Sequence, residues 1–244
     1  MQVPEDALNA AGGDTLRIIA VAPVGAHDTS RFCLLWASLI ETPHPFSEVW
    51  LVAPERARRR LRRVVGEDAR VRWLDDREVF PGIAGVLPDV GHLRPGYRRQ
   101  MLAKLWVAAQ RPEARACITL DADVLLWRPL RVEDTHDAEG RLWAFPELPA
   151  KHPRWYRSAS GILGLPRLKS SYWVTPCVLS PDVCARLLEH LRRRLGPFWR
   201  WRLLTSPHPW TEYSLYHTLG ASLEDGESRV FRTPGKRERW PAPL

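Results

Sequence analysis

Short apolar runs and amphipathic segments alternate along the first half of the chain. Apolar runs that end near Pro, Gly or Asp predict buried strands at 16–24, 48–53, 70–74 and 117–120. The segments between them carry apolar residues at helical spacing and predict helices at 31–40, 55–65 and 97–110. This order is typical of an α/β protein with a doubly wound, Rossmann-like mixed sheet flanked by helices. In such a protein the first strand is central, and ligands bind beyond the carboxyl ends of the strands.

The second half of the chain is less regular. Extended segments are predicted at 142–145 and 171–179, and helices at 182–195 and 211–219. Ser180 is placed to cap the first of these helices, with Pro181 at its first position. Residues 146–168 are interrupted by Pro and Gly, so we expect irregular structure there.

The length of 244 residues suits one α/β domain with one sizeable core. We expect a disordered leader at 1–15, a single domain at 16–220 and a polar tail at 221–244. With 45% hydrophobic and 26% charged residues, the composition is that of a globular protein. No apolar run is long enough to cross a membrane, and the first residues lack the order of a secretory signal, so we expect a cytoplasmic location.

The formal net charge of +8 comes almost entirely from arginine. A basic surface attracts nucleic acid, anionic lipid or a phosphorylated substrate, and charge alone does not choose among them. The stretch 198–204 alternates aromatic and basic residues, which suggests peripheral contact with an anionic membrane. The four cysteines show no metal-ligand spacing and are expected to be reduced, small hydrophobic residues.

Asp121 and Asp123 follow directly after the apolar run at 117–120. An ionised carboxylate beside a core is unfavourable by several kcal/mol unless it has a cation, strong donors or open solvent. A hard divalent cation with oxygen ligands meets that need. The plainer interpretation is a solvated turn after an ordinary strand, and an Asp-x-Asp pattern by itself does not exclude it.

On the helix at 97–110, Tyr97, Gln100 and Lys104 share one stripe. Four motifs follow one another along the chain: Arg99-Gln100, Lys104-Leu105, Leu120-Asp121-Ala122-Asp123 and Glu212-Tyr213-x-x-Tyr216. This ordered combination resembles that of the nucleotide-diphospho-sugar transferases, which are glycosyltransferases of the GT-A type. More narrowly, it is similar to a little-characterised bacterial group of that superfamily. The resemblance covers nearly the whole chain. It implies a nucleotide-sugar half at 16–130 and an acceptor half at 131–220.

In that superfamily the Asp-x-Asp holds Mn²⁺ or Mg²⁺, which bridges the two phosphates of the donor. The resemblance therefore implies Asp123 as the main metal ligand and Asp121 as a second ligand or a ribose contact. It also implies that Lys104 or Arg99 adds positive charge near the phosphates, with Gln100 beside them in the donor site. Lys104 could equally be a solvated helix residue. By position, Pro23 and Asp28 match the residues that hold the nucleotide base and ribose.

The resemblance further places a catalytic carboxylate late in the chain, where Glu212 is the best match. An inverting transferase needs such a base to take the proton of the acceptor hydroxyl. A glutamate at the start of a helix is also favoured by the helix dipole alone. His217 and His208 are candidates for an additional metal ligand, although a lone histidine is more often structural.

The acceptor, whether glycan, lipid or small molecule, is not identified by the sequence. Aromatic residues concentrate in the second half, and we expect one or two of them to stack on an acceptor sugar while the rest pack in the core. They are Trp155, Tyr156, Trp173, Trp199, Trp201 and Trp210.

Three other interpretations stay open at this stage. Leu120-Asp121-Ala122-Asp123-Val124 also fits the nucleophile motif of haloacid-dehalogenase-like phosphatases, but that motif is normally early in the chain and no convincing acidic pair follows it here. Nucleic-acid binding through the arginines lacks a recognition motif, and these arginines more often form a solvated helix face. A metal-binding protein without turnover is the third alternative, because a motif does not prove catalysis.

Overall fold

A computed structural model describes residues 17–80, 82, 95–147, 150–172, 175–223 and 231–232. The predicted leader at 1–15 and most of the predicted tail at 221–244 lie outside these residues. Among the described residues, no helix is long and apolar enough to cross a membrane.

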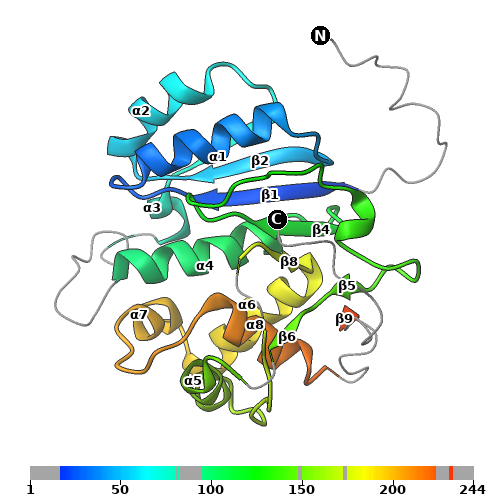
Figure 1. Cartoon of the computed structure of the whole chain (residues 1–244). Helices are drawn as coiled ribbons and strands as arrows, with labels where there is room; N and C mark the ends of the chain where they lie inside the picture. The colour runs from blue at the N-terminus through cyan, green and yellow to red at the C-terminus, as the bar shows by residue number, and fades with distance from the viewer. Residues whose placement is uncertain are drawn as a thin grey trace.

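A five-stranded sheet with the order β3-β2-β1-β4-β8 forms the centre of the protein (Figure 1). Four strands are parallel: β1 (Ile18–Pro23), β2 (Phe46–Val52), β3 (Val71–Leu74) and β4 (Ala116–Thr119). The edge strand β8 (Cys177–Leu179) runs antiparallel to β4. The prediction of a doubly wound α/β fold with the first strand in the middle is confirmed. The order reverses between β1 and β4, which is where ligands bind in such sheets.

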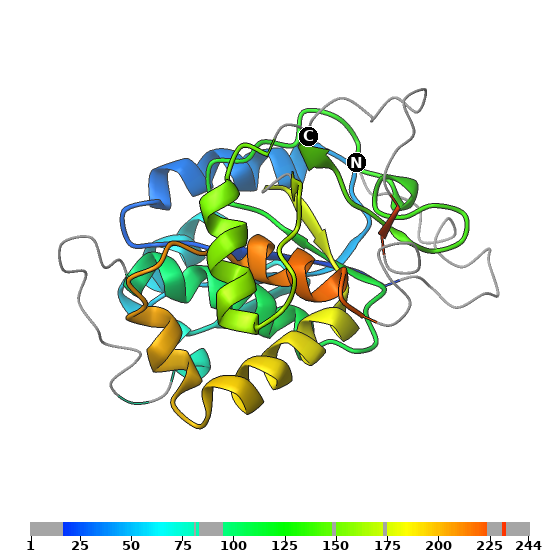
Figure 2. The ribbon, with the colours of Figure 1, turned by 90° about the horizontal axis from the view of Figure 1, so that it is seen from below.

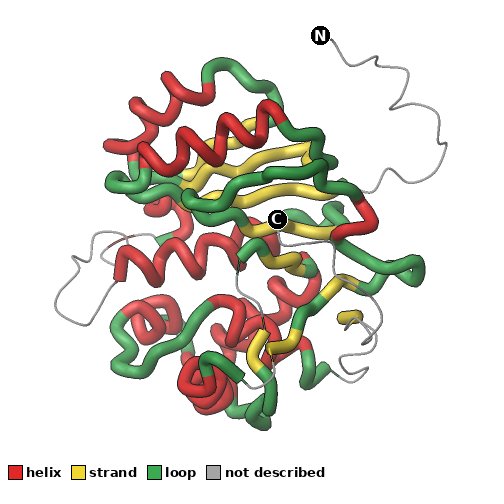
Figure 3. Tube along the Cα trace, viewed as in Figure 1, coloured by secondary structure: helices red, strands yellow, loops and turns green. Residues whose placement is uncertain are grey.

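Helices cover both faces of this sheet (Figures 1 and 3). α1 (Thr29–Glu41) and α2 (Glu55–Val65) lie on one face, and α4 (Pro95–Ala109), α6 (Pro181–Leu195) and α8 (Glu212–Gly220) on the other; the short α3 (Asp76–Val79) precedes α4. Alternate residues of β1 divide between the two cores: Ile18 and Ala20 pack toward α1, and Ile19 and Val21 toward α4. β1 is therefore buried on both faces, as its continuous apolar run predicts.

α4 is buried nearly all round rather than on one stripe. Its apolar residues Met101, Leu102 and Leu105 are buried, but so are Arg98 and Lys104. α4 contacts β1 on one side and α6 and α8 on the other, so no broad side of the helix faces solvent. Lys104 is consequently not a solvated helix residue, and the structure decides between the two interpretations that the sequence left open.

The second half adds short elements, most of which lie below the sheet in Figure 1. They are the 3₁₀-helix Val132–Asp134, β5 (Leu142–Trp143), β6 (Pro146–Glu147), α5 (Pro153–Leu163), β7 (Ser171–Tyr172), α7 (Trp199–Leu204) and β9 (Phe231–Arg232). The structure confirms the helix start at Ser180, whose hydroxyl accepts a hydrogen bond from the Val183 amide. Figure 2, seen from below, shows α5, α6, α7 and α8 together in front of the sheet.

Two features of this half differ from the sequence-based expectation. Residues 146–168, expected to be irregular, contain α5, because Pro153 occupies the first turn of the helix and Tyr156, Ala159 and Leu163 form a buried stripe. Within the predicted polar tail, Phe231 is buried and β9 pairs with β5. The centroid of the Phe231 ring lies 5.4 Å from that of the Tyr216 ring. A two-residue strand flanked by polar residues leaves no periodic signal in the sequence.

Candidate active site

A cavity of about 320 Å³ lies beyond the carboxyl ends of β1 and β4. Pro23, the last residue of β1, lines it together with Asp121 and Asp123, which follow β4. Helix α4 lines another wall through Met101 and through Tyr97, Gln100 and Lys104, the three residues predicted to share a stripe. The remaining lining residues are Asp28, Arg31, Ala122, Trp155, Thr211, Glu212 and Tyr213.

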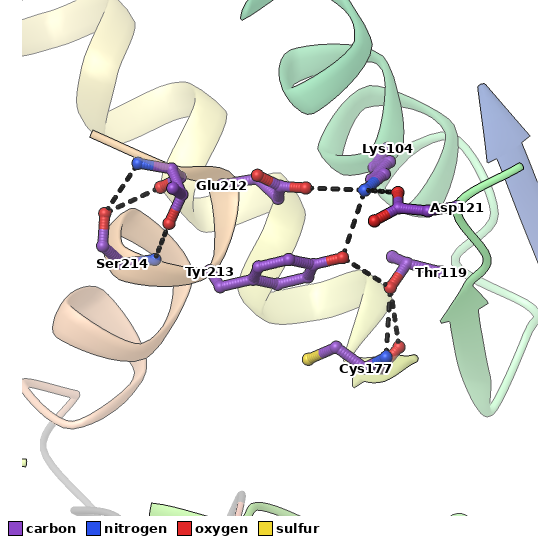
Figure 4. Close-up of polar contacts among 8 residues, drawn as sticks. Lys104, Thr119, Asp121, Cys177, Glu212, Tyr213 and Ser214 are labelled. Atoms are coloured by element: carbon purple, nitrogen blue, oxygen red, sulfur yellow. Dashed lines mark hydrogen bonds and ion pairs between the residues drawn. The ribbon is translucent and has the colours of Figure 1, made fainter. Parts of the chain in front are cut away.

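Lys104 is the centre of the site (Figure 4). Its side chain is 5% exposed, and its ammonium donates to Asp121 Oδ1 at 2.6 Å and to Glu212 Oε1 at 2.8 Å. It also donates to the Tyr213 hydroxyl at 3.1 Å. An ammonium has three protons, so all of its donors are used. Lys104 therefore joins α4, the end of β4 and the start of α8.

In the hydrogen bonds beyond Lys104, the donor and the acceptor can be assigned at each step. Because the Tyr213 hydroxyl accepts from Lys104, its one proton is available for the Thr119 hydroxyl at 2.9 Å. The Thr119 oxygen also accepts from the Cys177 amide at 3.1 Å and donates to the Cys177 carbonyl at 3.3 Å. A continuous set of hydrogen bonds thus runs from β8 through β4 and α8 to the lysine (Figure 4).

Burial by itself would lower the pKa of the Lys104 ammonium. The negative charges around it, that of Glu212 first, outweigh burial and raise the pKa well above its ordinary value, so Lys104 is charged at neutral pH. One ammonium does not balance the two carboxylates that it contacts. With Asp123 also lining the cavity, the local charge is negative and suits a cationic ligand.

Asp123 differs from Asp121 in its surroundings. Its side chain is exposed, and no hydrogen bond or ion pair joins it to another residue in the described part of the chain. Asp121, 38% exposed, has one oxygen bonded to Lys104. The described residues include no group of three or more His, Cys, Asp and Glu side chains that could enclose a metal ion. Two carboxylates in an open cavity nevertheless fit Mg²⁺ or Mn²⁺, because such ions commonly bind one or two carboxylates and complete their coordination with water and substrate phosphates.

The segment after β1 forms the opposite wall. Asp28 occupies the position before α1, but its side chain makes no capping hydrogen bond. It lies against Gly25, where an added Cβ would stand 2.7 Å from Asp28 Oδ2 and 3.1 Å from Gln100 Nε2. Gly25 therefore allows the carboxylate and the amide to approach the backbone closely. Arg31 is 3.9 Å from the Asp28 carboxylate.

Seven of the predicted site residues line this one cavity: Pro23, Asp28, Gln100, Lys104, Asp121, Asp123 and Glu212. Arg99 does not line it. Thr211 caps α8 by accepting from the Ser214 amide, and this cap places Glu212 on the first turn with its side chain only 3% exposed. Glu212 is thus more than a helix-start residue favoured by the dipole.

The structure does not bring the two candidate histidines to Asp123. His217 is buried on α8, four residues after Tyr213 of the cavity wall, with its ring stacked on Tyr172 at 4.1 Å. Its burial lowers its pKa to about 3. His208 is exposed and is also absent from the cavity lining. A histidine pattern in the sequence cannot reveal which face of a helix is buried in an aromatic cluster.

Several lining residues had no assigned role in the sequence. Tyr213 belongs to the Glu-Tyr-x-x-Tyr pattern, but its contact with Lys104 depends on two segments that are distant in the chain. Arg31 gave no signal, since one arginine on an amphipathic helix is ordinary. Of the expected aromatic residues, Trp155 lines the cavity, whereas Tyr156, Trp199 and Trp210 are buried and Trp201 is exposed; Trp173 lies outside the described residues.

The fold is similar to those of several solved glycosyltransferases. The bifunctional glycosyltransferase WbbM has a TM-score of 0.47 and 10% sequence identity, and the match covers 80% of this chain and 38% of that chain. Mouse xyloside xylosyltransferase 1 has a TM-score of 0.49 and 12% identity, with 89% of this chain and 85% of that chain covered. The galactosyltransferase LgtC, in complex with donor and acceptor sugar analogs, has a TM-score of 0.47 and 15% identity, with 82% of this chain and 69% of that chain covered. The chain thus spans well under half of WbbM. At these identities and TM-scores the similarity carries no inference about activity.

No curated protein sequence matches this chain. The sequence model of one family, described as a family of unknown function (DUF6492), matches residues 17–233. The match covers most of the chain, which therefore belongs to the DUF6492 family.

Proposed function

We propose that this protein is a metal-dependent glycosyltransferase that moves a sugar from a nucleotide-diphospho-sugar to an acceptor hydroxyl. The observation that carries the proposal is the Lys104 centre, which holds Asp121 and Glu212 in one cavity with Asp123 at the β1–β4 reversal. The cavity combines a candidate cation site with a separate, buried carboxylate, which are the two groups that a metal-dependent transfer with inversion uses. The resemblance in the sequence motifs points to the same chemistry.

Asp123 and the outer oxygen of Asp121 are the groups that would hold Mn²⁺ or Mg²⁺. When bound, such a cation stabilises the charge that develops on the leaving nucleoside diphosphate. Pro23, Asp28 and Gln100 line the same cavity and would contact the nucleoside. All three donors of Lys104 are already used by protein groups, so we assign it the role of holding carboxylates rather than that of a direct phosphate ligand.

Glu212 is the candidate base for an inverting reaction. Its Oε1 accepts from Lys104, which fixes the carboxylate relative to Asp121, and the residue lines the cavity. The other oxygen would take the proton of the acceptor hydroxyl as that oxygen bonds to the anomeric carbon and the sugar–phosphate bond breaks. Trp155 on α5 lines the cavity on the side of the acceptor half and offers a ring for a sugar.

The phosphatase and nucleic-acid interpretations have weaker support. A haloacid-dehalogenase-like site needs an acidic pair in addition to the Asp-x-Asp, and the metal-ligand types in the described ranges form no such cluster. Among the residues that the structure describes, Arg31 is the one arginine that lines the cavity.

A thermal-shift screen tests the proposal directly. UDP, GDP, CDP, dTDP and their sugars are added with and without Mn²⁺ to the wild type and to Asp123→Ala. A ligand that binds only the folded protein raises the melting temperature by mass action. We expect stabilisation by one nucleotide that requires Mn²⁺ and is absent in the variant. No stabilisation by any nucleotide would refute a nucleotide-sugar donor.

A further inference from the structure

The face of the protein formed by α1 and α2 carries exposed apolar side chains. Leu34 and Ile40 of α1 are 61% and 64% exposed. Leu125 and Trp127, in the segment that follows Asp123, are 48% and 64% exposed. These four are more than half of the large hydrophobic side chains that are exposed in the described part of the chain. Such a concentration on one region marks an interaction surface.

The segment that contains Leu125 and Trp127 is attached to α1. The Leu126 amide donates to the Ser38 hydroxyl at 3.1 Å, and the Thr42 hydroxyl donates to the Leu126 carbonyl at 2.9 Å. Leu126 itself is buried. In this extended segment its two neighbours are exposed, beside the outer side of α1.

Helix α2 adds a strongly basic face. Five of its arginines are exposed: Arg56, Arg59, Arg60, Arg62 and Arg63. The one acidic residue of this helix, Glu55, pairs with Arg58 instead. None of the five arginines forms an ion pair with another described residue; Arg62 lies over the ring of Trp73. The five positive charges are therefore not neutralised within the described protein.

The apolar and basic groups belong to one side of the molecule. α1 and α2 pack against each other and cover the same face of the sheet (Figure 1). α1 buries Phe32, Leu35, Trp36 and Leu39, and α2 buries Ala57, Leu61 and Val65. Their opposite sides point away from the sheet. We call Leu34, Ile40, Leu125, Trp127 and the exposed arginines of α2 other than Arg62, which lies over Trp73 of β3, the α1–α2 surface.

We propose that the α1–α2 surface docks on a membrane that contains anionic phospholipids. Arginine side chains bind the headgroup phosphates, while leucine, isoleucine and tryptophan side chains enter the boundary between headgroups and acyl chains. The combination distinguishes this partner from others. Nucleic acid would leave the apolar side chains exposed, and a second copy would present the same unneutralised positive charge, so a symmetric contact would lack charge complementarity.

This surface is different from the 198–204 stretch that the sequence suggested for membrane contact. In α7, Trp199, Leu203 and Leu204 are buried, and Phe198 and Trp201 are exposed on the opposite side of the sheet from α1 (Figures 1 and 2). One flat membrane cannot contact both sides. Leu125 of this surface follows two residues after Asp123, which lines the cavity. The docking itself does not depend on the proposed enzymatic activity.

Co-sedimentation of the full chain with lipid vesicles tests the proposal. We expect binding to vesicles of phosphatidylcholine mixed with phosphatidylglycerol, weak binding to phosphatidylcholine alone, and a loss of binding at high salt. Arg56→Gln/Arg59→Gln/Arg63→Gln should reduce the partition coefficient roughly hundredfold, since each arginine near an anionic surface contributes about fivefold. Leu34→Ser/Leu125→Ser should reduce it as well at unchanged net charge.

Matched controls lie on the other side of the protein. Arg186, Arg192 and Arg193 of α6 are 58%, 62% and 70% exposed, so changing these three to Gln removes the same charge from a different surface. This variant and Phe198→Ala/Trp201→Ala should bind nearly as the wild type does. An equal loss with the α6 variant, a loss with the Phe198/Trp201 variant, no binding by the wild type, or preferred binding to duplex DNA would each overturn the proposal.

Discussion

Lys104 and Glu212 are 108 residues apart in the sequence, yet the lysine Nζ lies 2.8 Å from the glutamate Oε1 in a buried ion pair. Asp121 is the second carboxylate on the same ammonium, at 2.6 Å. The pair connects α4 to α8 and fixes the two acidic groups of the cavity relative to each other. It is a structural link between the two halves of the chain, in addition to the β4–β8 pairing and the α4–α6 packing, and it is the centre of the proposed chemistry.

Lys104→Met should lower the free energy of unfolding by about 3–5 kcal/mol, because it leaves the buried Glu212 carboxylate without its cation. Urea unfolding at neutral pH measures this. The double variant Lys104→Met/Glu212→Gln should be more stable than the single one, since the uncompensated charge is removed. A single variant as stable as the wild type would show that the ion pair does not hold the two helices together.

Asp123→Asn should leave the free energy of unfolding within about 0.5 kcal/mol of the wild type, because the side chain is exposed. The same variant should lose the Mn²⁺-dependent part of nucleotide binding, measured by calorimetry. Asp182→Asn, an exposed carboxylate (67%) on α6, is the matched control and should bind normally. Unchanged metal-dependent binding by Asp123→Asn would exclude this residue as a ligand.

Glu212→Gln should retain nucleotide-sugar binding and lose transfer if the reaction inverts the anomeric centre. The amide oxygen can still accept from Lys104, but the side chain can no longer take a proton. A loss of roughly a hundredfold or more in kcat is expected for removal of a general base. The measurement is transfer or donor hydrolysis once the nucleotide is known, with product anomers determined by NMR. Wild-type turnover by this variant would rule out the base role.

Tyr213→Phe should destabilise the protein more than Tyr216→Phe. The Tyr213 hydroxyl accepts from a charged ammonium and contacts Thr119, whereas the Tyr216 hydroxyl accepts from the Ser180 amide. Both rings are buried, so the lost packing is similar. We expect about 2–3 kcal/mol for the first change and about 1 kcal/mol for the second, measured by chemical denaturation. The reverse order would contradict the assigned hydrogen bonds.

The pKa of the buried His217 is lowered from 6.5 to about 3 because burial disfavours the charged ring. The unfolded chain therefore takes up a proton at His217 as the pH falls below 6.5, while the folded protein does not until about pH 3. The neutral, buried His217 ring therefore makes its full contribution to the free energy of unfolding above pH 6.5. This contribution decreases as the pH falls from 6.5 to about 3, with a limiting slope of about 1.4 kcal/mol per pH unit.

His217→Phe, which preserves a ring against Tyr172, should make the unfolding free energy less dependent on pH between 6 and about 4. The pH dependence of the variant must be compared with that of the wild type. The pKa of His44 is also lowered, to about 4, so His44 contributes to the pH dependence of unfolding in both proteins with the same sign. Identical slopes for the two proteins would show that His217 is accessible to protons in the folded state.

Local patterns were sufficient for the first half of the fold and for the start of α6. The continuous apolar run of β1, the helical spacing in α1 and α2, and the cap at Ser180 each depend on residues within a few positions, so the sequence predicted these elements and the central place of β1. The position of Asp121 and Asp123 was also accessible, because residues after a parallel strand must lie at its carboxyl end. By contrast, α5 begins and ends in a Pro- and Gly-rich stretch, which obscured its buried stripe.

The tertiary structure alone decided how these groups are used. By itself the sequence could not show whether Lys104 is solvated, because its burial results from α4 packing between the sheet and two helices that come later in the chain. The hydrogen bonds of Lys104 to Glu212 and Tyr213 likewise depend on contacts between distant segments. So does the burial of His217 against the ring of Tyr172. Periodicity and caps determine local conformation over a few residues, whereas the environment of a charge depends on everything that surrounds it in space.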